Sequence, residues 1–216
     1  MLDFLRGTYG RALTPAARLL AAAGVTPVQV TVVGTAGVVA ASLTLLPLGH
    51  FLAGAIVIAV FLLGDGIDGT LARVTGRESS FGAFLDSTLD RAADAAVFSG
   101  LALWAAGGGP APGVGVDVTG VVNRPEILWL TLACLVFGFL VSYARARAEA
   151  VGVDASVGLF ERTDRLVGAL LGVLAVGLGA PVWVLSLALA VVAVGSAFTV
   201  AQRVHAAWMG FRARAD

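Results

Sequence analysis

Six apolar stretches divide this chain, and they constrain its fold more than any other feature. They cover residues 28–46, 51–74, 82–106, 126–146, 166–180 and 182–202. A helix needs about 20 apolar residues to cross a bilayer; the stretch 166–180 is short, but membranes tolerate some mismatch. Charged residues are only 13% of the 216 residues, against about 25% in a soluble domain. The sequence therefore predicts an all-α integral membrane protein with six transmembrane helices, with five spans as the alternative.

The first 22 residues are a different kind of segment, because arginines interrupt their apolar residues. Arg6, Arg11 and Arg18 alternate with leucines, which is typical of an amphipathic helix lying on a membrane surface. The segment lacks the compact apolar core of a signal peptide. We predict an interfacial helix over 1–22, with a solvated helix as the alternative. The chain 1–216 is expected to form a single membrane domain, in which the six-helix bundle covers 28–203.

Arginine gives the expected orientation, since all 14 basic residues are arginines. With six spans and both termini on one side, that side receives every arginine except Arg124. Cytoplasmic loops carry such an excess of positive charge. We therefore expect a multi-pass protein of the bacterial cell (inner) membrane with both termini cytoplasmic. Trp104, Trp129 and Trp183 would mark the outer ends of their spans, as aromatic belts do.

Four aspartates lie at the ends of the second and third stretches, where charge is expensive. Asp65 and Asp68 are three residues apart, and Asp86 and Asp90 are four apart, so each pair shares one helix face. At about 2.5–3.5 kcal/mol per aspartate in a membrane helix, four unpaired carboxylates would cost about 10–14 kcal/mol. The short connection 75–80 would bring the two pairs together at the cytoplasmic surface. Oxygen ligands alone favour Mg²⁺, Mn²⁺ or Ca²⁺.

These aspartates belong to a longer pattern, D-x2-D-G-x2-A-R-x8-G-x3-D-x3-D. Its eight fixed positions are Asp65, Asp68, Gly69, Ala72, Arg73, Gly82, Asp86 and Asp90. The pattern resembles the signature of the CDP-alcohol phosphotransferases. That resemblance implies a homodimeric membrane enzyme with two Mg²⁺ ions, or Mn²⁺, in which an alcohol displaces CMP from a CDP-linked lipid. It also implies that Asp90 is the base, and that the metal ligands are Asp65, Asp68, Asp86 and, as a partial or outer ligand, Asp90.

The segment 26–31 reads as a helix start, with Thr26 as N-cap and Pro27 at the first position. The family resemblance adds a second role, because it places this segment in the pocket for the CDP-lipid. The residues that it implies there are Val28, Gln29, Val30, Thr31, Gly69, Arg73 and Ser79.

Further arginines gather near the aspartates at the ends of the last three stretches. They are Arg145, Arg147, Arg162, Arg165 and Arg203. The positive-inside rule alone accounts for some arginine here, yet a phosphorylated acceptor would need such residues, since arginine binds phosphate through a planar fork. The stretch 142–165 resembles actinobacterial phosphatidylinositol phosphate synthases, although Ala150 replaces an expected glycine. The resemblance implies CDP-diacylglycerol as donor, inositol 1-phosphate as acceptor, and an acceptor-phosphate site made by Arg145, Arg147, Arg165 and Arg203.

Two other functions remain open at this point. Glycerol 3-phosphate is also a phosphorylated acceptor, so a phosphatidylglycerophosphate synthase is the nearest rival. A divalent-cation transporter would also need acidic residues in its spans, but transporters bind their ions near the membrane midplane, and these acids lie near one interface. No nucleic-acid partner is expected.

Overall fold

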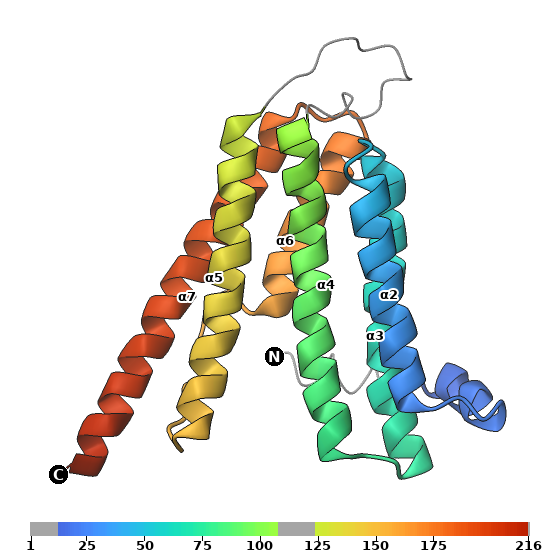
Figure 1. Ribbon diagram of the computed structural model, residues 1–216, viewed down its shortest axis with the longest axis vertical. Coiled ribbons are helices and arrows are strands. Elements are labelled where there is room, and N and C mark those ends of the chain that lie inside the picture. Colours follow the sequence, from blue (N-terminus) through green and yellow to red (C-terminus); the bar gives the residue numbers. More distant parts are fainter. Residues whose placement is uncertain (1–12, 108–123, 216) are drawn as a thin grey trace.

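The computed structural model describes residues 13–107 and 124–215, apart from the side chains of Asp65 and Ala215. Most of the predicted outer loop 107–125 and the first half of the predicted interfacial helix lie outside these residues. Residues 13–22 are helical and lie at one end of the bundle, to its side (Figure 1). Whether this helix rests on a membrane surface stays a prediction.

The described regular structure is entirely helical. Its long helices are α2 (Pro27–Leu45), α3 (Phe51–Thr75), α4 (Ser80–Gly107), α5 (Pro125–Ala150), α6 (Arg162–Gly177) and α7 (Trp183–Ala215). Each predicted apolar stretch therefore falls on one helix. Helix α7 runs well beyond the predicted end at residue 202, and α6 begins four residues earlier than predicted.

Helices α2, α3, α5 and α7 are long and apolar enough to cross a membrane. The two others lack this signature for different reasons. Helix α6 has only 16 residues, about 24 Å at 1.5 Å per residue. Helix α4 carries four charged residues between positions 86 and 94: Asp86, Asp90, Arg91 and Asp94. The prediction of a membrane protein is confirmed at the level of these four helices.

The six helices form a closed ring. Each packs chiefly against two others, in the order α2, α3, α6, α7, α5, α4 and back to α2 (Figure 1). Helices α2 and α4 approach closely at Gly100, where a Cβ atom would lie well inside contact distance of the Ser42 carbonyl oxygen. Small residues allow such close approach between membrane helices. The ring therefore places α4 between α2 and α5, in contact with both helices.

The tryptophans only partly follow the predicted outer belt. Trp129 and Trp183 are exposed, but Trp104 is buried at 1% exposure. Its ring meets Phe51 edge to face with 4.7 Å between ring centroids, and the Arg124 guanidinium lies 5.3 Å from its centroid. Trp104 thus belongs to the core, and it contacts the one arginine predicted on the outer side.

The connection from α5 to α6, residues 151–161, is fixed against α7. The Phe160 amide donates to Thr199 Oγ1 (2.9 Å), and the Leu159 amide donates to Gln202 Oε1 (3.1 Å). Arg203 Nε donates to the Val157 carbonyl (2.8 Å). These contacts hold the start of α6 well inside the bundle. The start of α4 and the end of α5 lie nearer the end of the bundle that they share (Figure 1).

Candidate active site

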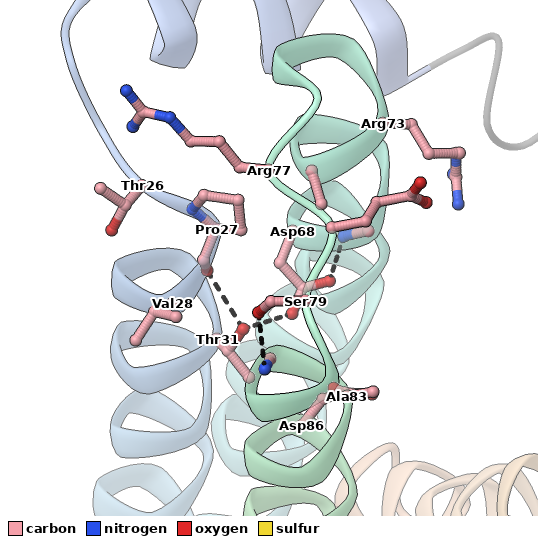
Figure 2. Close-up of a pocket in the computed structure, with 14 residues that line it drawn as sticks. Thr26, Pro27, Val28, Thr31, Asp68, Arg73, Arg77, Ser79, Ala83 and Asp86 are labelled. Atoms are coloured by element: carbon pink, nitrogen blue, oxygen red, sulfur yellow. Dashed lines mark hydrogen bonds between the residues drawn. The ribbon is translucent and has the colours of Figure 1, made fainter.

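A first pocket of about 360 Å³ opens where α2 begins, α3 ends and α4 begins. Figure 2 shows the side chains of all three helices converging on it. Its lining residues are Thr26, Pro27, Val28, Thr31, Asp68, Gly69, Ala72, Arg73, Arg77, Glu78, Ser79, Gly82, Ala83 and Asp86.

Two helices begin at this pocket, and each has a capped first turn. Thr26 Oγ1 accepts from the Gln29 amide (3.3 Å), while Gln29 Oε1 accepts from the Thr26 amide (2.9 Å). This confirms Thr26 as the N-cap of α2. Ser79 Oγ accepts from the Gly82 amide at the start of α4 (3.0 Å). Helix N-termini are positively polarised and suit phosphate groups, and the side chains of Arg73 and Arg77 add positive charge to the lining.

One hydrogen bond connects α2 to the acidic residues. Thr31 is buried, and its hydroxyl donates to Asp68 Oδ2 at 2.5 Å. The Thr31 hydroxyl oxygen also lies 3.1 Å from the Pro27 carbonyl oxygen. The dashed lines in Figure 2 mark these contacts. Thr31 therefore fixes the orientation of the Asp68 carboxylate relative to the start of α2.

The predicted acidic cluster comes together in part. Asp68 of α3 and Asp86 of α4 line the same pocket. Asp65 lies one turn before Asp68 in α3, and its side chain is not described. Among the described side chains, no three of His, Cys, Asp and Glu gather closely enough to hold a metal ion. The donor set nevertheless fits a hard divalent cation, because Asp68 and Asp86 offer only oxygen atoms to one pocket.

A second pocket of about 770 Å³ lies between α4, α5, α7 and the start of α6. Five arginines line it: Arg91, Arg145, Arg162, Arg165 and Arg203. Its other polar lining residues are Ser87, Thr88, Ser142, Tyr143, Glu149 and Glu161. Such a concentration of guanidinium groups favours an anionic ligand, and phosphate in particular.

Arg165 is the most deeply buried of these arginines, at 1% exposure. Its Nη2 donates to Asp94 Oδ2 (3.1 Å). Within the described part of the chain, its Nε and Nη1 have no hydrogen-bond partner. A buried guanidinium with two unsatisfied N–H groups is costly.

Arg203 has a more structural set of contacts. Its Nη1 donates to the Val141 carbonyl (2.6 Å) and its Nε to the Val157 carbonyl (2.8 Å). Arg203 therefore ties α5, the 151–161 connection and α7 together while it lines the pocket. Arg145 is exposed and pairs with Glu149 at 2.8 Å.

Asp90 lines neither pocket but lies next to residues of both. It follows Asp86 by one turn of α4, and its Oδ1 pairs with Arg162 Nη1 at 2.8 Å. Its Oδ2 is 3.4 Å from Arg91 Nη1. The first pocket includes Asp86 and the second includes Arg91 and Arg162. The carboxylate of Asp90 thus connects residues of the two pockets.

The residues suggested for the CDP-lipid and the acceptor divide into those that line a pocket and those that do not. Val28, Thr31, Gly69, Arg73 and Ser79 line the first pocket, and Arg145, Arg165 and Arg203 line the second. Gln29, Val30 and Arg147 are absent from both linings.

Sequence reasoning did not assign Arg77, Glu78, Arg91 or Glu161 to a site, and it gave Arg162 no specific role. Their proximity depends on which helices are neighbours. The only signal in the sequence was their charge at the predicted cytoplasmic ends of the helices.

Comparison with known proteins decides the class to which this site belongs. Residues 24–201 match the family described as CDP-alcohol phosphatidyltransferase. The chain belongs to that family. The match includes α2 to α6, the first part of α7, the whole first pocket and all of the second pocket except Arg203. The family prediction made from the 65–90 pattern is confirmed, and the chain is an enzyme of the CDP-alcohol phosphotransferase class.

Several relatives within this family carry the same name. The phosphatidylinositol phosphate synthase of Streptomyces avermitilis is 44% identical over 207 residues, covering 93% of this chain and 80% of that protein. The synthase of Mycobacteroides abscessus is 42% identical, covering 93% and 86%. The synthase of Cutibacterium acnes is 40% identical, covering 95% and 97%.

Solved structures agree with the sequence relatives. The phosphatidylinositol phosphate synthase of Mycobacterium tuberculosis with CDP-DAG bound superimposes with a TM-score of 0.81 at 40% identity, covering 92% of this chain and 94% of that one. The same synthase in complex with manganese and citrate gives a TM-score of 0.80, covering 91% and 88%. The CDP-alcohol phosphatidyltransferase fold is therefore shared along most of the chain.

Proposed function

We propose that this enzyme transfers the phosphatidyl group of CDP-diacylglycerol to inositol 1-phosphate, forming phosphatidylinositol phosphate and releasing CMP. The observation that carries the proposal is the position of Asp90. It follows Asp86, which lines the first pocket, by one turn of α4, and its carboxylate is paired with Arg162, which lines the second pocket. A transferase that joins two substrates needs a reacting group at such a junction.

The first pocket would hold the cytidine diphosphate part of the donor. The start of α2 offers its polarised N-terminus, and Thr31, Gly69, Arg73 and Ser79 line the space with Val28. Gln29 and Val30 would contribute through the backbone of the same turn, because the Gln29 side chain is engaged in the cap of α2. The bound CDP-DAG of the mycobacterial synthase supports this assignment for a chain of the same fold.

Asp65, Asp68, Asp86 and Asp90 would hold two Mg²⁺ ions, or Mn²⁺, at the inner end of this pocket. When bound, such ions neutralise the charge of the diphosphate and of the departing CMP. The Thr31 hydroxyl would keep the Asp68 carboxylate oriented for the ions. The mycobacterial synthase that was solved with manganese supports a divalent cation here.

The second pocket would hold inositol 1-phosphate. Arg165 lines this pocket together with Arg145 and Arg203, and the three guanidinium groups would place their positive charge around the acceptor phosphate. Arg147 is exposed and would act only through the long-range field that attracts the anion. The hydroxyl side chains of Ser87, Thr88 and Ser142 offer hydrogen-bond partners for the hydroxyl groups of the inositol ring.

The transfer step follows from these positions. A hydroxyl oxygen of inositol 1-phosphate attacks the phosphorus that carries the diacylglycerol, and Asp90 takes the hydroxyl proton. The bond from that phosphorus to the bridging oxygen breaks, and CMP leaves with the oxygen. The α4 helix positions Asp90 for both substrates, so that the reaction becomes effectively unimolecular once both are bound.

We also propose the membrane arrangement that the sequence predicts. The whole chain 1–216 would form one membrane domain, with α2 to α7 as six spans and residues 1–22 as an interfacial helix. The active site and both termini would face the cytoplasm of a bacterial cell. The excess of arginine at that end of the bundle supports this orientation. A homodimer, as implied by the family resemblance, completes the proposal.

The purified enzyme tests the choice of acceptor directly. CMP release from CDP-diacylglycerol is measured with inositol 1-phosphate, glycerol 3-phosphate or unphosphorylated inositol. We expect release only with inositol 1-phosphate, loss of release with EDTA, and recovery with Mg²⁺ or Mn²⁺. Release with glycerol 3-phosphate alone would make the chain a phosphatidylglycerophosphate synthase. Release with none of the three acceptors would overturn phosphatidyl transfer.

A further inference from the structure

Asp94 is a buried carboxylate that the proposed reaction does not use. It lies on α4 one turn beyond Asp90, and its side chain is only 8% exposed. Its two oxygens have different partners: Oδ1 pairs with Arg162 Nε and Oδ2 with Arg165 Nη2, both at 3.1 Å. A buried ion is tolerated only when its partners satisfy it. Asp94 meets that condition through two arginines of one helix.

Those two arginines occupy an unfavourable place. Arg162 and Arg165 lie in the first turn of α6, where the helix dipole disfavours positive charge. They are three residues apart and therefore share a face. Asp94 compensates both charges from the neighbouring helix α4. The capping carboxylates Glu161 and Asp164 are exposed by contrast and engage each other's backbone.

The contacts of Asp94 also set the orientation of both guanidinium groups at the second pocket, which the two arginines line. On Arg165, Asp94 binds Nη2. On Arg162, Asp94 occupies Nε while Nη1 reaches Asp90. Gly138 lies directly beside the Arg165 guanidinium, since a Cβ atom there would be 3.4 Å from Nε. The rotamer of Arg165 is thus set by a carboxylate on one side and a close helix on another.

We propose that Asp94 is the positioning residue of the acceptor site. It fixes the guanidinium groups of Arg162 and Arg165, which both line the second pocket, in the orientation that the acceptor phosphate needs, and it does not itself touch a substrate or the reacting atoms. This inference rests on the proposed function only in so far as the acceptor carries a phosphate. It connects the acceptor arginines to the aspartate helix through four side chains in the order Asp90, Arg162, Asp94 and Arg165.

The variant Asp94→Asn tests the role because it keeps the shape of the side chain and removes its charge. Its Nδ2 group would meet one guanidinium donor to donor, so at least one arginine loses its fixed orientation. We expect the KM for inositol 1-phosphate to rise about 10- to 100-fold, as when an orienting charge-assisted hydrogen bond is lost. The KM for CDP-diacylglycerol should stay within about two-fold, since the first pocket has no contact with Asp94 in the described structure. Asp94→Glu, which restores the charge, should recover part of the loss relative to Asp94→Ala.

Asp164→Asn is the matched control. It neutralises an exposed aspartate of the same helix turn, and the asparagine can still accept the cap hydrogen bond from the Glu161 amide. Its KM for both substrates should remain near that of the wild type. An unchanged acceptor KM in Asp94→Asn would overturn the proposal. So would a parallel loss of CDP-diacylglycerol binding, because Asp94 would then hold the bundle together and not the acceptor site.

Failure of this proposal is distinguishable from failure of the proposed function. If the wild-type enzyme prefers glycerol 3-phosphate, the same variants are measured with that acceptor, and the same selective rise in KM is expected. If the wild type uses inositol 1-phosphate and Asp94→Asn leaves its KM unchanged, only the positioning role is wrong.

Discussion

At the scale of single residues, the hydroxyl of Thr31 has a role in the site that its position in an apolar helix does not indicate. It donates to the Asp68 carboxylate, which lines the first pocket, proposed above for the donor and called the donor pocket from here on. A hydrogen bond to a charged group contributes about 1.5–3 kcal/mol to the stability of the folded state. The bond crosses from α2 to α3. Helix packing and the orientation of a proposed metal ligand therefore depend on the same side chain.

Thr31→Val removes this hydroxyl with little change of shape. We expect the Mg²⁺ concentration that gives half-maximal CMP release to rise about 10- to 100-fold, because the Asp68 carboxylate loses its orienting partner. Thr31→Ser keeps the hydroxyl and should stay close to the wild type. A Thr31→Val enzyme with an unaltered Mg²⁺ dependence would show that the hydrogen bond has no part in metal binding.

At the scale of elements, α4 is the helix that contributes to both proposed substrate sites. It begins at the donor pocket, carries Asp86, Asp90 and Asp94 on successive turns, and packs between α2 and α5. Its position against α2 depends on the absence of a side chain at Gly100, where the Ser42 carbonyl oxygen is in contact. A shift of α4 would move the donor pocket and the acceptor arginines relative to each other.

Gly100→Ala should separate α2 and α4 slightly. Overpacking of this kind costs about 1–3 kcal/mol, so we expect a lower midpoint of thermal unfolding together with reduced CMP release. Gly34→Ala on α2 is the control, since its Cβ atom would meet nothing within 4 Å. Equal thermal midpoints for the two variants would argue against a tight α2–α4 contact.

At the scale of the whole molecule, the ring of six helices explains why some of the site was predictable and some was not. The 65–90 pattern predicted that Asp68 and Asp86 would meet, because a short turn joins their helices and their spacing places them on the facing sides. The pairing of Arg162 with Asp90 was not predictable in this way. It requires the first turn of α6 to lie level with Asp90 and Asp94 of α4, and hydropathy gives neither the order of helices in a ring nor the depth at which each begins.

The burial of two arginines was also not predictable from the sequence. Arg165 and Arg203 both read as arginines of a cytoplasmic surface, and positive-inside topology gave them an alternative explanation. In the structure Arg165 is 1% and Arg203 is 4% exposed. Charges held this deeply need anionic or carbonyl partners. This burial, more than the number of arginines, supports a site for an anionic acceptor.

The most direct test of the central claim is single-turnover CMP release by Asp90→Asn, measured alongside the binding of CDP-diacylglycerol and inositol 1-phosphate to the same protein. If Asp90 is the base at the junction of the two pockets, CMP release should fall by about 10²- to 10⁴-fold, the usual contribution of a general base, while both substrates still bind. Release within a few-fold of the wild-type rate, with both substrates bound, would contradict the account.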